Sequence, residues 1–101
     1  MPMGDFDRRM AEDARLVILR ELAAQLDHRL NSSILSEALY AYGHNRSRDW
    51  LHTQLSILAD LGAIQTLDVG SVIIASLTAL GLDHVERRVV LSGVKRPSLG
   101  G

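Results

Sequence analysis

Arg46 and Arg48 are the side chains in this sequence best suited to recognising another molecule. Each guanidinium group presents a fork of N–H donors that fits the edge of a guanine or a phosphate group, so the pair favours contact with DNA. Both lie at the start of a predicted helix, and the exposed face of that helix extends the surface they begin. The residues predicted to contact DNA are Arg46, Ser47, Arg48, His52 and Thr53.

The charge of the neighbouring chain favours a different kind of partner. From Asp49 to Glu86 there are five acidic residues and no Lys or Arg. The net charge of the whole chain is −1, so no overall positive field attracts nucleic acid. The exposed face of the predicted third helix carries Asp49 and Asp60. A protein that binds this acidic face is therefore the alternative to double-stranded DNA as a partner.

Other kinds of site have few residues to support them. The chain has no Cys, which excludes disulfides and thiolate metal sites, and its four His show no ligand spacing. We therefore expect His28, His44, His52 and His84 to be solvated at the surface, and we assign no metal ligand. There is no Gly-rich phosphate loop, no Ser-His-Asp order and no paired carboxylates, so we expect neither an enzyme nor a bound cofactor.

Helical spacing of apolar residues predicts three helices in the first part of the chain. The first covers residues 7–26, the second runs from a cap at Asn31 or Ser32 to Gly43, and the third runs from a cap at Ser47 to Leu61-Gly62. Arg29-Leu30 fits a very short strand between the first and the second helix.

The third helix has one broad apolar face, which predicts its core side. Leu51, Leu55 and Leu58 lie along the centre of this face, and Trp50 lies at its edge. On the second helix the same reasoning places Tyr42 in the apolar stripe and directs Tyr40 outward.

A β-hairpin and a fourth helix follow. Residues 63–68 and 72–77 are β-rich runs, and Gly70 and Ser71 form the predicted tip between them. The tip offers Asp68 in place of a Lys or Arg, so we expect it to be structural. Thr78 can cap the fourth helix, which ends with two basic residues at 87–88.

At 101 residues the chain is long enough for one small domain. We expect an N-terminal tail over 1–6, a domain over 7–89 and a C-terminal tail over 90–101, because the last segment is rich in Gly, Pro and Ser. The fold class is mainly α with a small β-hairpin (α+β). With no apolar run of membrane length and no signal-peptide pattern, we expect a cytoplasmic protein without membrane contact.

Two patterns carry a resemblance to a known family. The pattern Ser47-Arg48-Asp49-Trp50-Leu51-x-x-x-Leu55-x-x-Leu58-x-x-Leu61-Gly62, a hairpin, and then Leu77-Thr78-x-x-Gly81 resemble small winged-helix proteins of the ArsR and MarR type. Nearly the whole chain, including Gly93-Val94-Lys95-Arg96-Pro97-Ser98, is similar to short ArsR-like proteins encoded in Mu-like phages and prophages. The resemblance implies a winged helix-turn-helix, in which three helices, a hairpin and a fourth helix follow in that order.

The resemblance also implies a homodimer that pairs through the first and fourth helices. The candidate interface residues are Val17, Leu82, Val85 and Val89. Two functions follow as alternatives. One is a DNA-binding regulator of phage or prophage transcription, and the other is a protein-interaction module in phage gene control or assembly with little or no DNA binding.

Overall fold

The computed structural model describes residues 4–98, which form four helices and a three-stranded antiparallel sheet. The elements in chain order are α1 (Asp5–Ala23), β1 (Arg29–Asn31), α2 (Ser32–Ala41), α3 (Arg48–Asp60), β2 (Ile64–Val69), β3 (Val72–Leu77) and α4 (Ala79–Val85). The predicted α+β class, the four helices and the hairpin between the third and fourth of them are confirmed. None of the described helices is long and apolar enough to cross a membrane.

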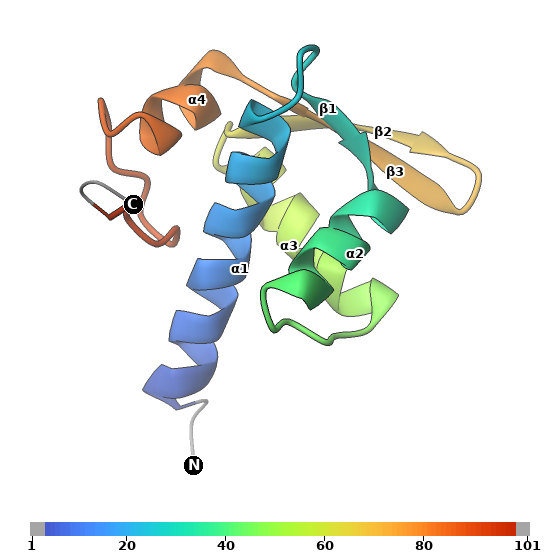
Figure 1. Ribbon diagram of the computed structural model, residues 1–101, viewed down its shortest axis with the longest axis horizontal. Helices are drawn as coiled ribbons and strands as arrows, with labels where there is room; N and C mark the ends of the chain where they lie inside the picture. Colours follow the sequence, from blue (N-terminus) through green and yellow to red (C-terminus); the bar gives the residue numbers. More distant parts are fainter. Residues whose placement is uncertain (1–3, 99–101) are drawn as a thin grey trace.

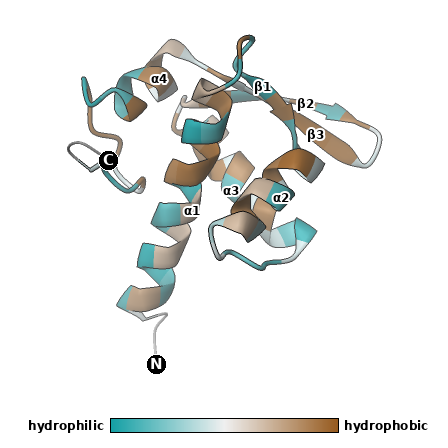
Figure 2. Ribbon diagram, in the orientation of Figure 1, coloured by the Kyte–Doolittle hydropathy of each residue, from teal (hydrophilic) through white to brown (hydrophobic). Residues whose placement is uncertain are grey.

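Helix α1 lies at the centre of the molecule and contacts the other three helices and the sheet. Figure 1 shows it between α4 and the C-terminal segment on one side and α2 and α3 on the other, with the sheet across its C-terminal end. The first turns of α1 extend beyond the other helices and the sheet. Figure 2 shows β3 as a mainly hydrophobic strand.

The core forms where α1, α2 and α3 meet the inner face of the sheet. Leu51, Leu55 and Leu58 of α3 are buried in it, as their helical spacing predicts. The other fully buried large aliphatic side chains are Ile18, Leu19, Leu22 and Leu35. The prediction for Tyr42 is wrong, because α2 ends at Ala41 and the tyrosine side chain beyond it is 62% exposed.

The sheet has the order β1-β3-β2, so β3 is central and the predicted hairpin forms one of its edges. Ile64 pairs with Leu77 at one end of the hairpin, and Val69 pairs with Val72 at the other. Gly70 has a φ of +62° at the tip, a backbone conformation that glycine adopts without strain. The predicted short strand is also present, as β1.

Thr78 and Gly81 explain the Leu-Thr-x-x-Gly pattern at the start of α4. The Thr78 hydroxyl donates to the Gly62 carbonyl oxygen at 2.6 Å and accepts the Gly81 N–H at 3.1 Å. It therefore caps α4 and ties it to the turn between α3 and β2. A Cβ on Gly81 would lie 2.2 Å from the Ala63 carbonyl oxygen, so only glycine allows this approach.

The chain after α4 differs from the predicted tail. It has no helix or strand up to Ser98, but it packs along α1. Val94 is 5% exposed, the Lys95 N–H donates to the Glu12 carbonyl oxygen, and the Arg15 guanidinium donates to the Gly93 carbonyl oxygen. At the other end, α1 begins at Asp5, inside the predicted N-terminal tail. Residues 1–3 and 99–101 of the two predicted tails lie outside the described residues.

Candidate nucleic-acid interface

The start of α3 places the two candidate arginines at the surface. Ser47 is the N-cap of this helix, and its hydroxyl accepts the Trp50 N–H at 3.1 Å. Arg48 is the first residue of the helix and Arg46 immediately precedes the cap, and both side chains are exposed. Within residues 4–98 neither guanidinium forms an ion pair with a carboxylate, so both remain available to a partner.

A cation–π contact restricts Arg46. Its guanidinium carbon lies 4.3 Å from the centroid of the Trp50 ring. Trp50 is half-buried and packs against the core, as predicted for a residue at the edge of the apolar face. The ring therefore holds the arginine in place at the surface, which lowers the entropy that Arg46 loses when it binds a partner.

His52 and Thr53, on the next turn of α3, have less capacity to bind than the sequence predicts. His52 is half-buried, and its Nε2 is buried without a hydrogen-bond partner in the part of the chain that the structure describes. The Thr53 hydroxyl is exposed, but it donates to the Asp49 carbonyl oxygen of its own helix at 3.1 Å. Its oxygen keeps the ability to accept a hydrogen bond from outside.

A hollow beside Arg48 adds groups that the sequence analysis did not select. It has a volume of about 210 Å³ and is lined by Ser32, Ser33, Ser36, Arg48 and Leu51. The serines lie in the first turns of α2, where the helix dipole favours negative charge. Asn31 is one of the two caps predicted for this helix, and its side chain accepts the Ile34 N–H at 2.9 Å. This predicted cap was the signal that could have pointed to the serines.

The hairpin tip adds no positive charge to this interface. Gly70 and Ser71 are exposed at the tip, and Asp68 is the charged residue nearest to them in the hairpin. The structure therefore brings together Arg46, Ser47, Arg48 and the start of α2, whereas the hairpin contributes no Lys or Arg.

The candidate dimer residues do not form one exposed patch. Val17 is 8% exposed in the core and has little surface to offer a partner, because α2, α3 and α4 of its own chain pack around α1. Leu82, Val85 and Val89 are half-buried. The apolar surface on this side belongs instead to residues such as Phe6 and Val90, which line a hollow of about 710 Å³ between α1 and the C-terminal segment.

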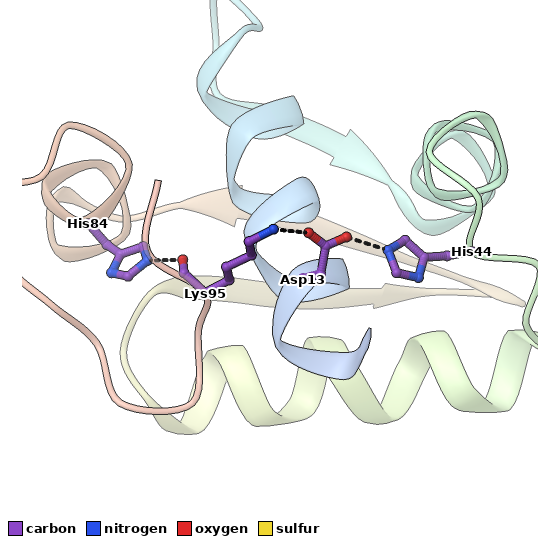
Figure 3. Close-up of polar contacts among 4 residues, drawn as sticks. All are labelled: Asp13, His44, His84 and Lys95. Carbon is purple, nitrogen blue, oxygen red and sulfur yellow. Dashed lines mark hydrogen bonds and ion pairs between the residues drawn. The ribbon is translucent and has the colours of Figure 1, made fainter. Parts of the chain in front are cut away.

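Two histidines that were expected at the surface are buried, so that prediction is wrong for both. His44 is 5% exposed and donates from Nε2 to the Asp13 carboxylate at 2.7 Å, and Lys95 binds the other oxygen of this carboxylate at 3.1 Å. His84 is fully buried, with Nδ1 accepting the Leu91 N–H and Nε2 donating to the Lys95 carbonyl oxygen. Figure 3 shows the contacts among Asp13, His44, Lys95 and His84, which join α1, the turn after α2, the C-terminal segment and α4.

The contacts of Asp13 change its titration. Burial alone would raise the pKa of this carboxyl, but the hydrogen bonds and charges of His44 and Lys95 outweigh burial and lower the pKa below its ordinary value of 3.8. A carboxyl whose pKa is lower in the folded chain stabilises the fold above its unfolded pKa. That stabilisation is lost as the pH falls through the folded pKa.

An Asp13→Asn variant is therefore expected to be less stable than the parent protein at pH 7, with a difference that shrinks as the pH falls below about 4. Urea unfolding at pH 7, 5 and 3 measures this difference. Asp7→Asn on the exposed first turns of the same helix is the matched control, and it should lower stability at pH 7 less than Asp13→Asn does. A stability difference that stays constant down to pH 3 would rule out the proposed role of the carboxylate.

Comparison of the amino-acid sequence with those of known proteins finds two relatives. The chain is 41% identical over 88 residues to the uncharacterized protein gp26 of Escherichia phage Mu, a match that covers 87% of this chain and 91% of the phage protein. The chain belongs to the gp26 family of Mu-like phages. The match to gp26 confirms the predicted association of this small protein with Mu-like phages.

A second relative is an uncharacterized protein of Haemophilus influenzae (strain Rd). It is 39% identical over 59 residues, which cover 58% of this chain and 57% of that protein. No protein-family model matches this chain, and no solved structure matches this chain.

Proposed function

We propose that this gp26-family protein is a winged-helix DNA-binding protein that regulates phage or prophage transcription in the bacterial cytoplasm. The observation that supports this proposal most directly is the exposed pair Arg46 and Arg48 at the start of α3, free of carboxylate partners among the described residues. In a helix-turn-helix, this end of the second helix enters the major groove. The order of α2, α3, hairpin and α4, and the resemblance to ArsR and MarR proteins, support the same arrangement.

The hollow at the start of α2 gives this interface a second contact to DNA. The exposed hydroxyls of Ser33 and Ser36 and the positive end of the α2 dipole suit a backbone phosphate, while Arg48 at the rim of the hollow can reach either the phosphate or a base edge. In a homodimer, two such surfaces about 34 Å apart would read a palindromic operator. The proposed role requires no cofactor and no catalytic group.

An Arg46→Ala, Arg48→Ala double variant is expected to lose at least about tenfold in affinity for its DNA site, because each good arginine contact contributes about 1–3 kcal/mol. Fluorescence anisotropy against DNA fragments from the protein's own genomic neighbourhood, titrated with salt, measures the loss. The slope of log affinity against log salt should also fall by about one or two, since phosphate contacts release counterions.

An Arg8→Ala, Arg9→Ala double variant is the matched control, because it also removes two positive charges, in this case from the exposed N-terminal part of α1. The control should bind DNA within about twofold of the parent if the contacts are local to α3. Equal losses in the two double variants would indicate a general charge effect and would contradict the proposed interface. If the parent protein bound none of the DNA fragments even at low salt, the proposed role as a transcription regulator would be wrong.

A protein-interaction module is the second candidate function, and one observation favours it. The interval 49–86 contains most of α3 and the whole hairpin, yet it carries five acidic residues and no Lys or Arg. A surface of this charge repels phosphate and attracts a basic protein segment. Under this alternative the arginines before α3 would affect DNA binding little, which the same anisotropy experiment measures.

A further inference from the structure

The outer face of the hairpin is apolar and uncovered. Leu67 pairs with Ile74 and Val69 with Val72, and residues paired directly across two strands share a face of the sheet. Leu67 is 57% exposed and Val69 is 47% exposed, while their partners on β3 are half-buried. The opposite face is the one that packs on the core, through residues such as Ala75. The hairpin therefore presents four aliphatic side chains on the face directed away from the protein.

Strand β2 also has a free edge. It is the outer strand in the order β1-β3-β2, and its residues from Gln65 to Val69 are exposed. The Thr78 N–H donates to the Ala63 carbonyl oxygen, which fixes Ala63 as a hydrogen-bonded position in the ladder with β3. Bonded positions alternate along an antiparallel pair, so Gln65 and Leu67 also bond β3. The backbone groups of Thr66 and Asp68 consequently point outward, away from β3.

Within β2, one charged residue is the only protection of this edge against further pairing. Exposed edges in natural sheets are commonly interrupted by Pro, Lys, a bulge or an inward-pointing charge. The six residues of β2 include no Pro and no Lys, and their pairing with β3 is continuous from Ile64 to Val69, without a bulge. The one charged residue in the strand is Asp68. An added strand would therefore find donors, acceptors and apolar side chains in the regular spacing of a sheet.

We propose that β2 binds an extended, basic segment of another protein, which joins the sheet as a fourth strand. Every second side chain of this segment would be aliphatic and would pack beside Leu67 and Val69. Charge selects the partner. Two copies of this chain paired through β2 would bring together two Asp68 carboxylates with no Lys or Arg in either hairpin, and DNA phosphates meet the same repulsion. A Lys- or Arg-bearing strand neutralises Asp68 instead.

The first test uses labelled eight-residue peptides in which Val or Ile alternates with Thr and two Lys stand at each end. Amide exchange of the full chain, followed by NMR, is expected to slow at least about tenfold at Thr66 and Asp68 when the peptide binds. Exchange at Gln65 and Leu67 should change little, because their N–H groups already bond β3. If none of the peptides binds at about 1 mM, or if protection appears elsewhere, β2 is not the docking edge.

A Thr66→Pro variant separates the edge from the rest of the fold. Its ring removes an outward N–H and leaves the ladder with β3 in place, so peptide affinity is expected to fall at least about tenfold while the unfolding curve stays cooperative. Thr66→Val keeps the N–H and is the matched control, with affinity expected within about twofold of the parent. Equal affinity of the two variants would overturn the proposal.

Two further outcomes identify the occupant. A peptide with Glu in place of Lys is expected to bind at least about fivefold more weakly, and equal binding would overturn the charge argument. Self-association of the protein without peptide, lost in Thr66→Pro, would show that a second copy occupies the edge and would also overturn it. DNA binding of Thr66→Pro should equal that of the parent, so this test and the test of the regulator can fail independently.

Discussion

Replacing Gly81 with alanine is expected to lower the free energy of unfolding by about 3 kcal/mol, or to prevent folding altogether. The new Cβ would lie 2.2 Å from the Ala63 carbonyl oxygen and 2.7 Å from a methyl carbon of Leu77. The first of these atoms is backbone and accepts the Thr78 N–H, so it cannot move without breaking the tie between α4 and the turn after α3. The loss is expected even though alanine favours a helix by up to about 1 kcal/mol over glycine.

Urea unfolding measured by circular dichroism gives the size of this effect. Ala79→Leu is the matched control, because position 79 is exposed in the same helix and a larger side chain there meets solvent. The control is expected to change stability by less than about 0.5 kcal/mol. If Gly81→Ala were as stable as the parent, α4 could shift freely against the α3–β2 turn, and the close approach would not be a constraint of the fold.

The local parts of the fold followed from the sequence because local signals determine them. Ser47 and Thr78 were identified as helix caps and Asn31 as one of two candidates, and each of the three accepts a backbone N–H from its own helix. The apolar spacing of α3 predicted its buried leucines for the same reason. Gly81 was predictable only in part. The sequence shows the Leu-Thr-x-x-Gly pattern that contains it, but the steric need for glycine there depends on the position of Ala63.

The path of the C-terminal segment was not predictable in this way. Its contacts join residues far apart in the sequence, such as Lys95 with Asp13 and Gly93 with Arg15. A segment held by single hydrogen bonds and one buried valine has no hydrophobic period, so it resembles a tail. The buried histidines were missed for the same reason, because His44 and His84 find partners that no spacing reveals.

The candidate site was predictable where it depends on the start of α3 and not where it depends on packing between elements. The exposure of Arg46 and Arg48 follows from their place beside the Ser47 cap. The cation–π contact with Trp50 and the hollow at α2 require the angle between two helices, which periodicity does not give. The dimer residues were taken from a resemblance, and Val17 illustrates its limit, since the chain's own elements cover it.

The second large effect is expected at His84, which holds the C-terminal segment to α4. A His84→Leu variant keeps a buried apolar side chain but leaves the Leu91 N–H and the Lys95 carbonyl oxygen without their partner. Each lost partner costs about 1–3 kcal/mol when the group stays buried, so the free energy of unfolding is expected to fall by about 2–4 kcal/mol. Amide exchange at Leu91 should accelerate more than exchange in α3, because the segment detaches before the core unfolds.

Two conservative variants divide this effect between the ring nitrogens. The side-chain oxygen of His84→Asn can replace Nδ1 as the acceptor for Leu91, whereas the amide N–H of His84→Gln reaches further and can replace Nε2 as the donor to Lys95. Each variant keeps one of the two bonds, so each is expected to lose about half as much stability as His84→Leu. If all three variants lost the same amount, the burial of the ring and not its hydrogen bonding would hold the segment, and exchange at Leu91 would then follow global unfolding.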